Sequence, residues 1–75
     1  MFNEGDNVIL TLDTWNGLAK NLKKDNLPKD SPVFQITWKM NSCGMIYYRC
    51  YYSGFGSFWF CDYQVLKAPY IPKAL

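Results

Sequence analysis

The chain has 75 residues, of which 49% are hydrophobic and 19% aromatic, and it contains no histidine. A chain of this length buries roughly 60–65% of its surface on folding, which allows one domain over residues 1–75. The lack of histidine excludes Ser-His-Asp and Cys-His catalytic units, and the many aromatic residues exclude disorder. We therefore expect a single folded domain that is not an enzyme and uses no cofactor.

The charges and cysteines indicate the environment of the protein. Eight basic and six acidic residues give a net charge of +2, which is low for a committed nucleic-acid binder. The N-terminal segment lacks the features of a signal peptide, and no apolar run reaches the about 18 residues that span a bilayer. Three cysteines, Cys43, Cys50 and Cys61, form no CxxC pair and lack a fourth ligand, so we expect no metal site, reduced thiols and a cytoplasmic location. Cys50 and Cys61 could face each other across a hairpin.

The first predicted element is a β-strand over residues 7–12. Val8, Leu10 and Leu12 alternate with Ile9 and Thr11, and both faces are largely apolar, so we expect this strand to be central in its sheet.

A short helix is predicted in the long connection that follows, residues 13–32. Trp15, Leu18 and Leu22 have helical spacing, Asp13 or Thr14 can cap the N-terminus, and the helix should end near residues 25–26.

A three-strand meander comes next. Residues 33–40 alternate strictly and predict a half-buried strand with Phe34, Ile36, Trp38 and Met40 on one face. A turn at residues 41–44, a strand over 45–52, a turn at 53–56 and a strand from 57 to 61 or 62 follow. A tight turn at 62–64 then leads into a last strand at 65–67, and Pro69 and Pro72 indicate an irregular tail over 69–75.

Five short strands with a long first connection predict an all-β or β-dominated α+β fold, a small, partly open barrel of antiparallel strands with one short helix. The opening Gly5-Asp6-x-Val8-x-Leu10 and the closing Asp62-Tyr63-Gln64-Val65-Leu66 resemble SH3-like barrel proteins of phages and other mobile elements. This resemblance implies an SH3-like domain that binds protein or nucleic acid. It also suggests an accessory protein that acts in the cytoplasm of a host.

The strand over residues 45–52 carries the strongest candidate site. If Ile46, Tyr48, Cys50 and Tyr52 face the core, the opposite face presents an aromatic and cationic row, composed of Met45, Tyr47, Arg49 and Tyr51. Tyrosine and arginine dominate interface hot spots, and the same residues could stack bases and hold a phosphate. Ordinary packing of aromatic side chains across neighbouring strands is the structural alternative.

Aromatic residues are also concentrated around the following turn, with nine in residues 47–63. Phe55, between Gly54 and Gly56, should project from the turn unless its ring folds back over the end of the barrel. The leading hypothesis is an exposed aromatic surface that binds a host protein and inhibits it by occlusion. Its predicted residues are Tyr47, Arg49, Tyr51, Phe55, Trp15 and Lys39.

Two other functions stay open. A nucleic-acid-binding module would use Lys20, Lys23, Lys24, Lys39 and Arg49, although lysines of this kind are more simply the solvated side of a helix and loop. Alternatively, the aromatic surface could be a subunit interface of a homo-oligomer.

Overall fold

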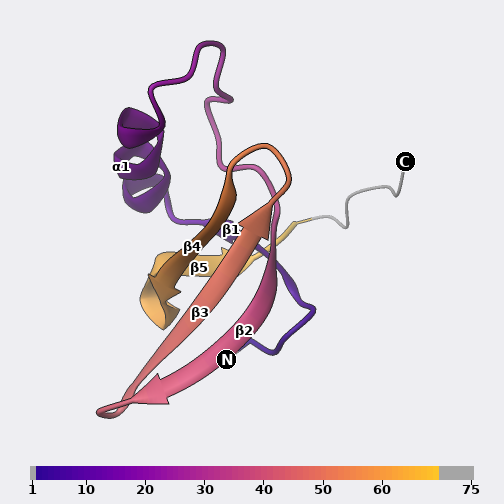
Figure 1. Cartoon of the computed structure of the whole chain (residues 1–75), viewed down its shortest axis with the longest axis vertical. Helices are drawn as coiled ribbons and strands as arrows, with labels where there is room; N and C mark the ends of the chain where they lie inside the picture. The colour runs from indigo at the N-terminus through magenta and orange to yellow at the C-terminus, as the bar shows by residue number, and fades with distance from the viewer. Residues whose placement is uncertain (1, 70–75) are drawn as a thin grey trace.

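The computed structural model describes residues 2–69, and in these residues five antiparallel strands form one open sheet with a single α-helix beside it (Figure 1). The elements are β1 (Asn7–Leu10), α1 (Leu12–Leu22), β2 (Phe34–Ser42), β3 (Met45–Tyr52), β4 (Gly56–Cys61), the 3₁₀ helix η1 (Asp62–Gln64) and β5 (Val65–Lys67). The strand order is β4-β3-β2-β1-β5. The predicted β-dominated fold with one helix in the first connection is confirmed, and β1 is an interior strand, as expected, between β2 and β5.

The border between β1 and α1 differs from the prediction. The strand ends at Leu10, and the Oγ1 atom of Thr11 accepts a hydrogen bond from the Thr14 N–H at 3.4 Å. Thr11 is thus the N-cap, in place of Asp13 or Thr14. Leu12 therefore begins the helix and is 62% exposed, so its predicted place on the core face of a strand is wrong.

The helix is also shorter at its C-terminus than the prediction. Lys23 adopts a left-handed conformation with φ of 51°, which ends α1 at Leu22. The helical spacing itself is confirmed, because Trp15 is buried and Leu18 and Leu22 pack against the core.

A β-bulge in β2 changes which side chains face the core. Ile36 lies opposite Cys50, but Trp38 lies opposite Arg49, so Thr37 is an extra residue in the ladder. One extra residue inverts the alternation beyond it. Phe34 and Ile36 are consequently buried, whereas Trp38 and Met40 are 52% and 42% exposed, and the prediction of one shared face is wrong for these two.

The expected alternation of β3 is confirmed. Tyr48 and Cys50 are buried, while Ile46 and Tyr52 pack against the core at either end. The turn before β3 consists of Cys43 and Gly44, both with positive φ, which suits the twist of a tight hairpin.

The three cysteines are free, and the suggested approach of Cys50 to Cys61 does not occur. Cys50 lies opposite Phe58, and Cys61 lies opposite Tyr47, because the turn between β3 and β4 is centred on Gly54. Burial raises the pKa of the Cys50 thiol to about 12, so this group is a core side chain and not a reactive one.

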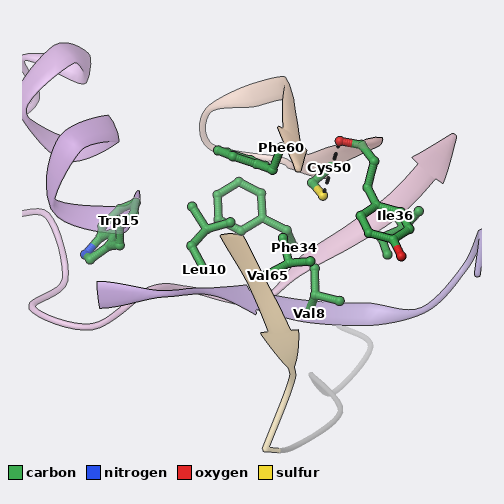
Figure 2. Close-up of a cluster of buried hydrophobic side chains, with 9 residues drawn as sticks. Val8, Leu10, Trp15, Phe34, Ile36, Cys50, Phe60 and Val65 are labelled. Carbon is green, nitrogen blue, oxygen red and sulfur yellow. Dashed lines mark hydrogen bonds between the residues drawn. The ribbon is translucent and has the colours of Figure 1, made fainter. Parts of the chain in front are cut away.

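The core lies on the inner side of the sheet, with Phe34 at its centre (Figure 2). The Phe34 ring centroid is 5.7 Å from that of Tyr52 and 6.2 Å from that of Phe60. Trp15 lies at one end of the cluster and donates its indole N–H to the Pro28 carbonyl oxygen at 3.1 Å. The buried side chains are Val8, Leu10, Trp15, Phe34, Ile36, Tyr48, Cys50, Phe60 and Val65.

Tyr48 connects the sheet to both chain segments that enter and leave it. Its hydroxyl donates to Asp62 Oδ1 at 2.7 Å and accepts from the Phe2 N–H at 3.0 Å. Burial is the main reason that the pKa of Tyr48 is raised, with a further contribution from Asp62. These bonds place η1 and β5 so that Val65 enters the core.

Helix α1, the one α-helix of residues 2–69, is too short and too polar to cross a membrane. The expected irregular tail falls outside these residues, except for Pro69, which follows β5.

Candidate binding face

The side of the sheet that faces away from the core presents a row of three large side chains. Arg49 on β3 lies opposite Trp38 on β2 and opposite Trp59 on β4. Directly opposite residues on neighbouring strands have Cβ atoms about 4.5–5.5 Å apart, so Trp38 and Trp59 flank Arg49 across the sheet. Both tryptophans are about half exposed. The row is therefore a surface feature and not part of the core.

The next row extends this surface, with Tyr47 opposite Met40 on one side and Cys61 on the other. A shallow depression of about 390 Å³ lies here, lined by Met40, Ser42, Tyr47 and Trp59. We call the whole surface the outer face and define it as Trp38, Met40, Met45, Tyr47, Arg49, Tyr51 and Trp59. Arg49 is the only charged residue among them.

Thr37, the bulged residue, positions Arg49. The Arg49 Nε–H donates to Thr37 Oγ1 at 3.1 Å, and the same hydroxyl donates to the Arg49 carbonyl oxygen at 3.2 Å. The Nε–H is one of five N–H donors of the guanidinium, and within residues 2–69 the other four have no hydrogen-bond partner.

Two of the predicted aromatic site residues are not on this surface. Trp15 is only 1% exposed. The ring of Phe55 folds back over the core, with its centroid 4.8 Å from Tyr52 and 5.9 Å from Trp15. The expectation that these rings are exposed is wrong, because the turn directs Phe55 against α1 and the sheet instead of into solvent.

The ring of Phe55 is also covered from outside. The Lys24 Nζ atom lies 5.4 Å from its centroid and donates to the Gly54 carbonyl oxygen at 2.8 Å. A cation over an aromatic face is favourable, so this lysine has a structural role.

The predicted basic residues do not gather around the aromatic row. Lys39 lies opposite the buried Tyr48 and is thus on the other side of the sheet from Arg49. Lys20, Lys23 and Lys24 lie at the C-terminal end of α1 and just after it. Tyr47, Arg49 and Tyr51 are the predicted residues that do share one face.

Three residues of the outer face were missed by sequence reasoning: Trp38, Met40 and Trp59. The sequence does contain a signal for Trp59, because Phe58, Trp59 and Phe60 are consecutive in a strand. Side chains alternate along a strand, so Trp59 faces outward if Phe58 and Phe60 face inward. No comparable signal exists for Trp38 and Met40, because their orientation depends on the bulge.

Within residues 2–69 no group of three or more cysteine, aspartate or glutamate side chains is placed to hold a metal ion. Comparisons of the chain with models of protein families, with curated proteins and with solved structures find no match.

Proposed function

We propose that this protein is a binding module and that its outer face docks on another protein. The row of Trp38, Arg49 and Trp59 is the observation that carries the proposal. Tryptophan, tyrosine and arginine supply most of the residues whose truncation costs an interface much of its binding free energy. A contiguous exposed apolar surface with a single polar anchor is typical of such interfaces.

The chemistry of the outer face restricts the partner. The four remaining N–H donors of the exposed Arg49 can hold a carboxylate with two parallel hydrogen bonds. The surrounding indole, phenol and thioether groups require apolar contacts. The partner should thus present one acidic side chain within an apolar patch.

The resemblance to SH3-like proteins of phages and mobile elements suggests that the partner is a host protein. Binding that covers its working surface would inhibit it. Nucleic acid fits the outer face less well, because Arg49 is the only cation there and tracking a phosphate backbone needs several.

A pull-down from a candidate host lysate, followed by mass spectrometry, tests this proposal. The bait is the wild-type protein beside Trp38→Ala and Arg49→Ala, with Leu66→Ala as the control, since Leu66 is equally exposed but lies on β5. The same protein should be captured by the wild type and the control. Each outer-face variant should bind it at least about tenfold more weakly, as expected for hot-spot truncation.

Nuclease treatment and a salt series distinguish the alternative ligand. Capture that disappears with nuclease, or affinity that falls steeply between about 50 and 200 mM salt, would indicate nucleic acid and contradict a protein partner. Equal capture by all four baits would show that the outer face is not the binding surface.

A further inference from the structure

The strand β4 lies at one border of the sheet and has none of the features that usually prevent an edge strand from pairing. Its six residues, Gly56–Cys61, include no charged residue and no proline. Proteins commonly protect edges with lysine, proline, bulges or very short strands. An uncharged edge of this length can thus accept a further strand.

The other edges within residues 2–69 are protected. The strand β5 has only three residues, contains Lys67 and is followed by Pro69. The end of β2 projects beyond its neighbours together with β3 (Figure 1), but it carries Lys39, whose N–H donates to Glu4 Oε2 at 3.3 Å. This contrast makes β4 the edge that is open to pairing.

The hydrogen-bonding pattern shows which backbone groups of β4 point outward. In an antiparallel ladder, successive residues of a strand direct their N–H and C=O groups alternately to one side and the other. The two-residue turn makes Ser42 and Met45 a hydrogen-bonded pair, so the odd-numbered residues of β3 bond to β2 and the even-numbered ones bond to β4. Their partners on β4 are the even-numbered residues, which leaves Ser57 and Trp59 directed outward.

A second observation agrees with this assignment. Cys61, the next odd-numbered residue, donates its N–H to Gln64 Oε1 at 2.8 Å and not to β3. The C-terminal end of the edge is thereby closed, and the open part holds two residues with four free backbone groups.

We propose that two copies of this chain pair antiparallel through β4 and form one continuous sheet. With the two-fold axis at Phe58, Ser57 of each copy lies opposite Trp59 of the other. All four free backbone groups then form hydrogen bonds, and none is needed from Cys61, whose N–H is occupied. A register shifted toward Cys61 would require the Cys61 N–H, which already donates to Gln64. A register shifted toward the turn would place Trp59 opposite residues that precede β4, where no strand is available for pairing.

The side chains fit this register as well. Trp59 is large and Ser57 is small, so each indole has room beside the serine of the other copy. On the inner side, the two Phe58 rings would meet in a non-hydrogen-bonded pair, where side chains approach most closely. Phe58 is only partly buried in the single chain, and this contact would cover it further.

Pairing through β4 would bring the two outer faces side by side on the same surface of the joined sheet. Trp38 and Arg49 lie on interior strands and would stay accessible. The inference does not depend on the proposed partner, and it would give one assembly two copies of the binding surface.

Sedimentation analysis of the purified chain over a range of concentrations tests the pairing. A reducing agent is required, because Cys43 is exposed and could cross-link two chains. The mass should rise with concentration from 8.8 kDa toward twice that value. Ser57→Lys should weaken dimerisation at least about tenfold, since it places a charge on the edge.

Gln35→Lys is the matched control. Gln35 lies in the same cross-strand row as Ser57, through Tyr51, but on an interior strand. The Gln35→Lys variant should dimerise as the wild type does. A wild type that stays monomeric at all concentrations, or a Ser57→Lys variant that dimerises like the control, would overturn the proposal.

Amide hydrogen exchange gives an internal check that does not require a variant. The N–H groups of Ser57 and Trp59 should exchange more slowly as the protein concentration rises. Those of Phe58 and Phe60, which bond to β3, should be protected at every concentration. Exchange at Ser57 and Trp59 that does not change with concentration would contradict pairing through β4, while leaving the proposed partner binding unaffected.

Discussion

Thr37 and Arg49 exchange two hydrogen bonds across the bulge in β2. The Thr37 hydroxyl accepts from the Arg49 Nε–H and donates to the Arg49 carbonyl oxygen. The residue that breaks the regular ladder is therefore also the one that holds the only charge of the outer face. The bulge also turns Trp38 to the outer face. One local irregularity therefore accounts both for the exposure of Trp38 and for the hydrogen bonds that hold Arg49.

Replacing Thr37 with valine should free the Arg49 side chain. The Nε–H loses its acceptor, so we expect its exchange with solvent, measured by NMR, to become faster. The free energy of unfolding should fall by no more than about 1 kcal/mol, because the bonds are exposed. Thr37→Ser keeps the hydroxyl and should behave like the wild type. An Nε–H signal that is unchanged in Thr37→Val would show that this bond does not form in solution.

Tyr48→Phe should destabilise the fold. The substitution leaves Asp62 and the Phe2 N–H without their hydrogen-bond partner, and we expect a loss of about 1–3 kcal/mol in urea unfolding. Tyr47→Phe is the control, because Tyr47 lies on the outer face, where removal of a hydroxyl should change the stability by less than about 0.5 kcal/mol. Equal effects of the two substitutions would contradict the structural role assigned to Tyr48.

Phe55→Ala should lower the free energy of unfolding, because the ring packs against the core and not on the outer face. Its ring contacts Trp15, Phe34 and Tyr52, so truncation should cost about 2–3 kcal/mol of unfolding free energy, somewhat less than for a fully buried phenylalanine. Tyr51→Ala, on the exposed side of the sheet, should cost less than about 1 kcal/mol. A Phe55→Ala variant as stable as the wild type would mean that the ring projects into solvent after all.

The stability should decrease at alkaline pH. Burial raises the pKa of Cys50 from 9.0 to about 12, so the folded state keeps this proton at pH values where the unfolded state loses it. The stabilising effect is complete below pH 9 and is lost between pH 9 and about 12, by at most about 1.4 kcal/mol per pH unit. The raised pKa of Tyr48 acts in the same direction above its ordinary value of 10.0.

Urea unfolding at a series of pH values tests this dependence. Between pH 9 and 10 the slope should be smaller in Cys50→Ala than in the wild type, whatever the loss of packing at neutral pH. Cys43→Ala removes an exposed thiol and is the control for the substitution itself. A slope that is the same in Cys50→Ala and in the wild type would show that another group controls alkaline unfolding.

Most of the strands and the helix could be predicted because their signals are local. Alternation in residues 45–52 depends only on the period of a strand, and it correctly separates Tyr48 and Cys50 from Tyr47, Arg49 and Tyr51. The helical spacing of Trp15, Leu18 and Leu22 is local in the same way. The start of α1 was misplaced because Leu12 fits both the strand before it and the helix that it begins.

The sequence by itself thus determined a β-dominated fold with one short helix and with more aromatic residues than its core can hold. Only the tertiary structure decided which of these rings are exposed. The bulge at Thr37 depends on pairing with β3, and it moved Trp38 and Met40 outward. The packing of Phe55 against Trp15 and Tyr52 depends on residues distant in the chain, and it moved a predicted surface ring into contact with the core.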